Sequence, residues 1–122
     1  MNRYEIHIPV RYNDGTAVEQ HKIDQTQTEL TDRFGGVTVA GPIKGWWFDD
    51  GTVYQDDQLL FVVDTEDGDP RFWYSYADEL KRRFDQHELY VVAYSVHVLE
   101  HDTEEETLAL ATAPAFGSEL RA

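Results

Sequence analysis

The chain has 122 residues, enough for one hydrophobic core and too few for two independent ones. Its 24 acidic residues against 10 Lys and Arg give a formal net charge of -14, which disfavours direct binding to DNA or RNA because their phosphates would be repelled. The absence of cysteine excludes disulfides, thiolate nucleophiles and cysteine-based metal sites.

Hydrophobic residues make up 41% of the sequence and aromatic residues 13%, so a packed domain is expected rather than a disordered chain. No apolar run approaches the roughly 18 residues that a membrane-spanning helix needs. The N-terminal segment 1–5 is polar and lacks the apolar region of a signal peptide. The expectation is therefore a cytoplasmic protein with no membrane partner.

Residues 3–12 alternate between two kinds of side chain, as in a strand with one buried face. The apolar set is Tyr4, Ile6, Ile8 and Val10, and the opposite set is Glu5, His7, Pro9 and Arg11. The turn-forming residues 13–15 follow. Proline has no amide hydrogen for a neighbouring strand, so we expect this strand to bulge or end early at Pro9.

A polar helix is predicted next, because Thr16 and Glu19 have the spacing of a capping box. The residues at spacing i, i+4, i+7, i+11 are Ile23, Gln27, Leu30 and Phe34. Gly35 and Gly36 are expected to end the helix.

A β-hairpin is predicted between the two helices. A short strand at 37–40 is interrupted by Gly41-Pro42 and resumes over 43–48, and Asp49-Asp50-Gly51 forms the turn. The return arm begins at Thr52, crosses the polar residues 55–58 and enters the apolar pentad 59–63, which has the composition of a central strand.

The second predicted helix has Asp69 as its N-cap and Pro70 at its first position. Its apolar positions are Trp73, Ala77, Leu80 and Phe84. Residues 89–99 form the last predicted strand, rich in β-branched and aromatic side chains. We expect the domain to cover 1–100, and the acidic and small-residue segment 101–122 to be a tail that is flexible or docks on a partner subunit.

This order of elements, βαββαβ, predicts the ferredoxin-like α+β fold, with a four-stranded antiparallel sheet and two helices on one face. A resemblance rests on the stretch from Tyr4 to 13–15, the hairpin with Gly45-Trp46-Trp47 and Asp50-Gly51, and the strand 59–64 followed by 76–84. These features resemble small bacterial ferredoxin-like domains of unknown function and, more loosely, the dimeric α+β barrel superfamily. The resemblance implies fold and subunit pairing and transfers no active-site residue.

Two helices cover only one face of such a sheet. If Tyr90 and its alternate neighbours point to the helices, the opposite face of the last strand carries Val91, Ala93, Ser95, His97 and Leu99. That set is too apolar for open water, so we expect a homodimer that packs sheet against sheet.

On that face His7 and His97 come from neighbouring strands, with Glu5, Arg11 or Ser95 in reach. Histidine titrates near neutrality, so His7 and His97 are the candidate catalytic residues for general acid or base work. The alternative is that both are ordinary packing or rim residues.

No metal or other cofactor is expected. Neither predicted helix has a metal-binding histidine spacing, and the acidic loop 64–69 lacks the bidentate glutamate of a calcium-binding EF-hand.

Adjacent aromatic residues in a strand point to opposite faces, so one domain is not expected to bury all of Trp46, Trp47 and Phe48. Trp46 or Trp47 would line a pocket or anchor an interface. Alternatively, one is a core residue and the other shields the hairpin.

The sequence thus predicts a small acidic homodimeric domain that binds a small molecule or a protein partner, with Glu5, Arg11, Trp46, Trp47 and Ser95 as ligand or interface residues. The alternative is a small-molecule enzyme of the dimeric α+β barrel kind, an oxygenase or isomerase, that uses His7 and His97.

Overall fold

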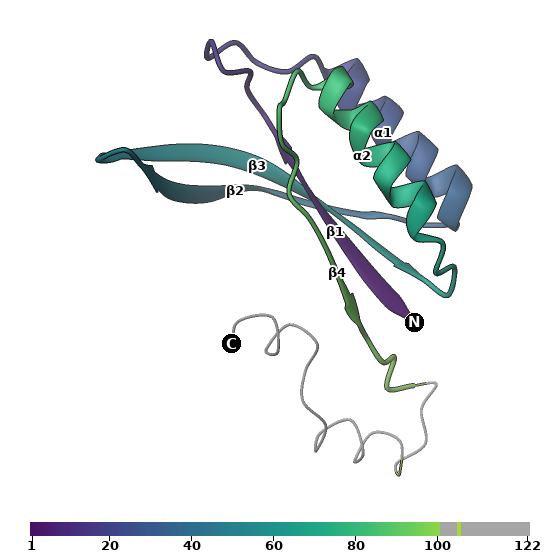
Figure 1. The fold of residues 1–122 in the computed structure, drawn as a ribbon. Coiled ribbons are helices and arrows are strands. Elements are labelled where there is room, and N and C mark those ends of the chain that lie inside the picture. Colours follow the sequence, from purple (N-terminus) through teal and green to yellow (C-terminus); the bar gives the residue numbers. More distant parts are fainter. Residues whose placement is uncertain (101–104, 106–122) are drawn as a thin grey trace.

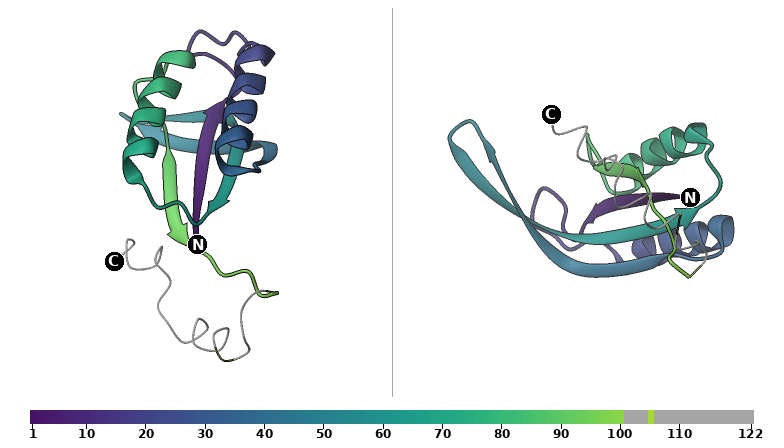
Figure 2. Two further views of the ribbon diagram at one scale, coloured as in Figure 1. Left: turned by 90° about the vertical axis from the view of Figure 1, so that its right-hand side faces the viewer. Right: turned by 90° about the horizontal axis from the view of Figure 1, so that it is seen from below.

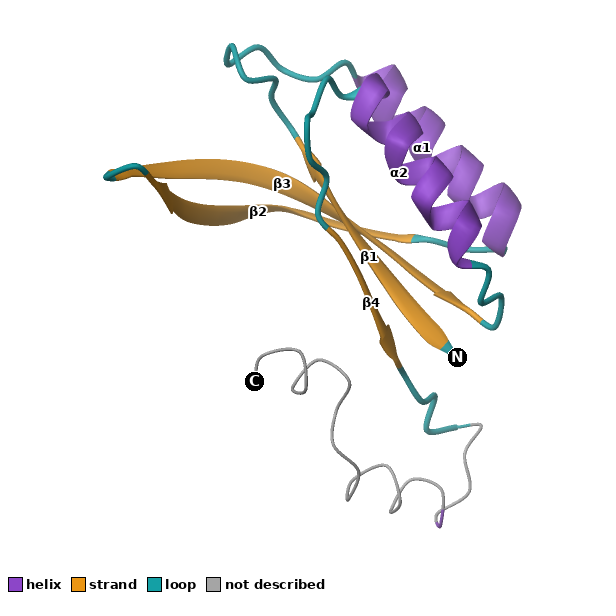
Figure 3. Ribbon diagram, viewed as in Figure 1, coloured by secondary structure: helices purple, strands orange, loops and turns teal. Residues whose placement is uncertain are grey.

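The computed structural model describes residues 1–100 and 105, so most of the predicted tail lies outside the described residues. The elements are β1 (Asn2–Pro9), α1 (Gln20–Phe34), β2 (Thr38–Asp49), β3 (Thr52–Thr65), α2 (Pro70–Arg83) and β4 (Val91–Ser95). All neighbouring strands are antiparallel, in the order β2-β3-β1-β4. Both helices cover one face of the sheet (Figures 1 and 3), so the predicted ferredoxin-like fold is confirmed.

The core lies between the helices and the two central strands. Tyr4, Ile6 and Ile8 of β1 point toward the helices, as their alternation predicts, and Phe61 and Val63 of β3 lie beside them. The helices contribute Ile23, Leu30, Trp73 and Leu80, and Phe84 follows α2. Most of the residues at the predicted helical spacings are therefore buried or half-buried, although Gln27 is exposed.

The predicted start of α1 is wrong. The helix begins at Gln20, and its N-cap residue Glu19 makes no capping side-chain bond. The Thr16 hydroxyl instead donates to Asp14 Oδ1 at 2.6 Å, because the 12–16 turn places that nearby carboxylate within reach. The predicted end is confirmed, since Gly35 has a φ of 82°.

The start of α2 is confirmed as predicted. Asp69 caps the helix, its carboxylate accepting the backbone N–H of Arg71 at 3.1 Å, and Pro70 occupies the first turn.

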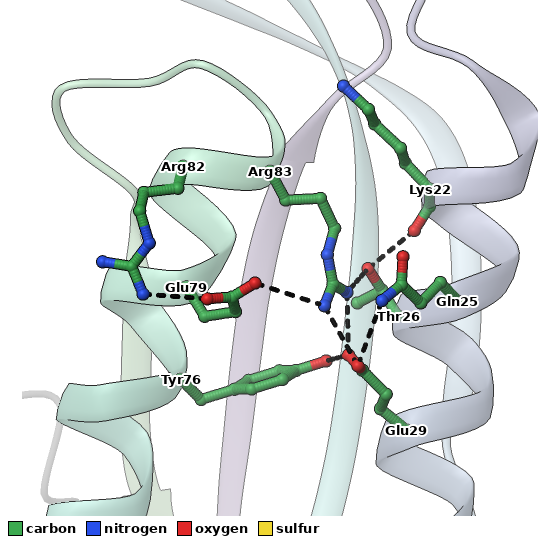
Figure 4. A network of polar contacts seen from close by, with 8 residues as sticks. All are labelled: Lys22, Gln25, Thr26, Glu29, Tyr76, Glu79, Arg82 and Arg83. Carbon is green, nitrogen blue, oxygen red and sulfur yellow. Dashed lines mark hydrogen bonds and ion pairs between the residues drawn. The ribbon is translucent and has the colours of Figure 1, made fainter.

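A polar network joins the two helices across the groove between them (Figure 4). The Arg83 guanidinium, whose side chain is only 6% exposed, donates to Thr26 Oγ1 and Glu29 Oε2 and forms an ion pair with Glu29 Oε1 at 2.8 Å. Tyr76 donates its hydroxyl to the same carboxylate at 2.9 Å. Burial, the largest influence, would raise the pKa of Glu29, but the hydrogen bonds from Arg83 and Tyr76 outweigh it and hold that pKa below its usual range.

The β2–β3 hairpin covers nearly the residues predicted for it, and each of its strands is continuous. The predicted break at Gly41-Pro42 is a β-bulge between Ala40 and Ile43 inside one continuous strand. The turn at 49–52 is confirmed, with positive φ at Asp50 and Gly51. Because β1 ends at Pro9, the hairpin continues past it and projects from the body as a two-stranded ribbon (Figures 1 and 2).

The last strand is shorter than predicted, and its two faces are exchanged relative to the prediction. β4 covers only 91–95, and Val91 pairs with Ile6 and Ala93 with Tyr4, so both point toward the helices. The apolar patch predicted from Val91, Ala93 and Leu99 on the other face is therefore wrong. The reason is the register of β4 against β1, because an offset of one residue exchanges the two faces of a strand.

Candidate functional site

The sheet face that the helices leave open carries polar pairs around a narrow apolar strip. Arg3 bonds Asp64 through two parallel contacts of 2.8 and 2.9 Å, and this hydrogen-bonded pair lowers the pKa of Asp64. Tyr94 donates its hydroxyl to Glu5. The strip consists of Leu60, Val62 and Val92, all half-buried. Pairing through this face stays a prediction, with a smaller apolar area than the sequence implied.

A cleft opens at one end of this face, where β1 stops and the ribbon continues. It encloses about 530 Å³ and is lined by His7, Pro9, Trp47, Asp56, Gln58, Gln86, Glu88, Leu89 and Tyr90. β1 supplies His7 and Pro9, the two hairpin strands supply Trp47, Asp56 and Gln58, and the connection from α2 to β4 supplies the rest. We call it the His7 cleft.

A chain of hydrogen bonds fixes His7 within the cleft. His7 Nδ1 lies 2.9 Å from Gln58 Oε1, and Gln58 Nε2 lies 3.0 Å from Asp56 Oδ2. A carboxylate only accepts, so the Gln58 amide nitrogen faces Asp56 and its oxygen faces His7. His7 must then donate from Nδ1, and in the neutral ring the lone pair is on Nε2. The arrangement makes His7 Nε2 a hydrogen-bond acceptor of defined orientation.

Aromatic rings stand beside this histidine. The Tyr90 ring meets the His7 ring nearly edge-on with centroids 4.9 Å apart. Trp47 stacks on Tyr54 at 4.4 Å, and half of its surface remains exposed. Flat apolar surfaces near a directed polar atom are the usual composition of a small-molecule site.

A second hollow of about 520 Å³ borders the His7 cleft, and four residues line both. The shared residues are Pro9, Trp47, Asp56 and Gln86. The second hollow adds Arg11, exposed and 3.4 Å from the Gly15 carbonyl, together with Asp57 and Tyr54. Carboxylates outnumber Arg11 over the two hollows, so they favour neutral or cationic molecules over anions.

The structure does not bring His7 and His97 together, and this part of the predicted site is wrong. Asn2 pairs with Ser95, so Ser95 and His97 lie at the N-terminal end of β1. The strand from Asn2 to His7 spans about 16 Å. Any catalytic role of either histidine stays a prediction.

The other predicted site residues are also dispersed. Glu5 lies in the middle of the sheet face, and Arg11 lines only the second hollow. Trp46 pairs with Gln55 and is 63% exposed on the ribbon face opposite Trp47.

Gln58 and Asp56 are site residues that the sequence reasoning missed. Their signal was present, because residues 55–58 place four polar side chains in a strand that is apolar on both sides. An interruption of this kind marks a position where a strand leaves the core.

The described residues contain no group of three His, Asp or Glu side chains placed to hold a metal ion. None of the helices found among them is long and apolar enough to cross a membrane.

Comparison with known proteins places the fold. No protein-family model matches the chain, and no curated protein sequence matches it. Among solved structures, it is similar to the divalent cation tolerance protein CutA1 from Thermus thermophilus, at 15% identity and a TM-score of 0.56, covering 89% of this chain and 93% of the other. CutA1 from Oryza sativa matches at 14% identity and 0.52, covering 82% and 84%.

A phage SAM lyase in complex with S-methyl-5'-thioadenosine is a further structural neighbour. It has 13% identity and a TM-score of 0.52 and covers 83% of this chain and 92% of the lyase. At such identities the likeness establishes the shared ferredoxin-like architecture alone.

Proposed function

We propose that this chain is a small-molecule-binding domain whose His7 cleft takes a flat, heteroaromatic molecule that carries an N–H donor and no negative charge. The observation that carries the proposal is the chain from Asp56 through Gln58 to His7, which leaves Nε2 as the acceptor of a histidine that lines a cleft with aromatic residues. The ligand would donate to His7 and stack on Trp47.

The charge of the cleft supports the same class of ligand. Asp56, Asp57 and Glu88 line the His7 cleft or the hollow beside it, and Arg11 is the single Lys or Arg among the described residues that line the two. A phosphorylated ligand would meet these carboxylates, whereas an exocyclic amine or a cation would be attracted.

The SAM lyase supports the choice of a first probe. That neighbour holds S-methyl-5'-thioadenosine, which combines a flat heteroaromatic base with an amine and has no phosphate. We therefore select adenosine and S-methyl-5'-thioadenosine as probes, with adenosine 5'-monophosphate as the anionic counterpart.

The test is a titration followed by Trp fluorescence and by two-dimensional NMR of the backbone amides. We expect a nucleoside to shift amides of residues around His7, Gln58 and Trp47, and the monophosphate to bind at least about tenfold more weakly. His7→Phe keeps a ring and removes the acceptor, so it should abolish binding, whereas Trp46→Phe on the opposite ribbon face should not change it. The proposal would be refuted if neither nucleoside bound at millimolar concentration, or if His7→Phe bound a nucleoside as tightly as the wild type does.

An enzyme that uses His7 alone is the second candidate function. A histidine that lines a cleft and has one ring nitrogen held by a neighbour has the arrangement of a general base. His97 has no part in it, because the strand register separates the two histidines.

Incubation with S-adenosylmethionine, followed by proton NMR, distinguishes the two functions. Turnover that is lost in His7→Phe and retained in Trp46→Phe would support the enzyme. Binding without turnover would support the binding domain.

A further inference from the structure

The distal part of the β2–β3 hairpin, residues 43–57, exposes large apolar side chains on both faces, and we call it the aromatic ribbon. Phe48 is 71% exposed, Val53 65% and Trp46 63%. Phe48 pairs directly with Val53, and Trp46 lies on the same face. Trp47 and Tyr54 form a stacked pair on the other face, which borders the His7 cleft.

Both edges of the ribbon are also open. Within the part of the chain that the structure describes, β2 is an outer strand of the sheet, and β3 has no neighbour on its other side before Asp57, because β1 ends at Pro9. A two-stranded ribbon is marginal in water by itself, and open edges with apolar side chains are templates for association. The exposed apolar side chains and the open edges therefore indicate that the ribbon associates with a macromolecular partner.

We propose that two copies of this chain associate through their aromatic ribbons, side by side and antiparallel about a two-fold axis. One face of the ribbon supplies part of the area that such an interface needs. The exposed fractions of Trp46, Phe48 and Val53, at about 200 Å² for each large side chain, amount to on the order of 400 Å² of apolar side chain. A stable interface buries about 800 Å² on each partner, so the ribbon backbone and polar atoms would supply about the other half.

Charge complementarity selects the antiparallel arrangement. Lys44 stands at the base of the ribbon, and Asp49 and Asp50 form its tip, about 17 Å away along the strand. None of these three forms an ion pair within the described residues. An antiparallel pair places each acidic tip beside the Lys44 of the other copy, whereas a parallel pair would bring the two acidic tips together.

Sedimentation velocity over micromolar to high micromolar concentration tests the association. We expect a dimer that strengthens with salt, because each copy carries a net charge of -14. Phe48→Ser combined with Val53→Thr should weaken the dimer by about thirtyfold or more. The matched control is Tyr74→Ser, which removes an equally exposed aromatic ring from α2 and should change nothing.

A charge exchange tests the orientation. Lys44→Glu should weaken the dimer, and Asp49→Lys with Asp50→Lys should weaken it as well, whereas the three changes together should restore it. Restoration is expected only if Lys44 meets the tip of the other copy.

Three results would overturn the proposal: a monomer at every concentration and salt, a dimer that the Phe48 and Val53 changes leave intact, or failure of the charge exchange to restore association. A dimer lost on Val62→Asp but kept in the ribbon variants would assign pairing to the sheet face instead. The substituted side chains lie away from Trp47 and Tyr54, so nucleoside titration of the same variants reports on the His7 cleft separately.

Discussion

Replacing Arg83 by methionine should destabilise the domain by removing the cation that joins the two helices. Methionine keeps most of the aliphatic length, so the change isolates the polar contacts. The guanidinium is 2.8 Å from Thr26 Oγ1 and 2.8 and 3.0 Å from the two Glu29 oxygens. Thr26 stays satisfied after the change, because its hydroxyl also donates to the Lys22 carbonyl at 2.8 Å. The cost therefore falls on Glu29.

The size of the expected loss in stability depends on how exposed the side chains of Arg83 and Glu29 are. Breaking a fully buried ion pair costs about 3–5 kcal/mol. The Arg83 side chain is 6% exposed but that of Glu29 is 39% exposed, so water takes over part of the solvation of the carboxylate. We expect a loss of about 2 kcal/mol in the free energy of unfolding at neutral pH, measured by urea denaturation.

The pH dependence of this loss tests its origin. Arg83 and Tyr76 hold the folded-state pKa of Glu29 below that of the unfolded chain, so this stabilisation is complete above the unfolded pKa and is lost as pH falls through the folded one. The difference between wild type and Arg83→Met should therefore shrink as the pH falls from neutral toward 3, below the ordinary glutamate pKa of about 4.3.

Arg82→Met is the matched control, because Arg82 is 70% exposed on the same helix and pairs only with exposed Glu79. It should cost less than about 0.5 kcal/mol. A loss in Arg83→Met that is as small as this, or one that does not change with pH, would refute the assignment of the stability to the Arg83–Glu29 pair. A double-mutant cycle with Glu29→Gln would measure the coupling directly.

Five further substitutions test the fold, each by urea denaturation. Gly41→Ala should lower the free energy of unfolding by about 2–3 kcal/mol, because Gly41 has a φ of 115° and a Cβ there would lie 2.9 Å from the Gln58 carbonyl oxygen. Gly51 has a φ of 78° and no atom within 4 Å of such a Cβ, so Gly51→Ala should cost only about 1 kcal/mol. Equal losses would contradict the steric reason. Phe61→Ala should cost about 3–5 kcal/mol, since Phe61 is fully buried on the central strand, and a loss below about 1 kcal/mol would mean that the core is elsewhere. Asp69→Ala should cost about 1 kcal/mol through loss of the cap of α2, and Asp69→Asn, which can still accept the Arg71 N–H, should retain most of it.

The sequence by itself determined the elements, their order and most of the core. These features depend on local periodicity: alternation places Tyr4, Ile6 and Ile8 on one face of β1, and helical spacing places Leu30 and Leu80 inside. Turn chemistry likewise predicted the end of α1 at Gly35 and the turn after Asp49. Alternation, helical spacing and turn residues depend only on a few neighbouring residues, so they can be recognised in the sequence alone.

Only the tertiary structure decided how the strands are offset against one another, and the candidate site depends on that offset. Register between β1 and β4 turned Val91 and Ala93 toward the helices and moved His97 away from His7. Register between β1 and β3, together with the early end of β1 at Pro9, placed Gln58 against His7 and left the aromatic ribbon unsupported. A slip of one residue preserves every local pattern but exchanges the two faces of a strand, so alternation along one strand cannot determine which side chains meet across the sheet.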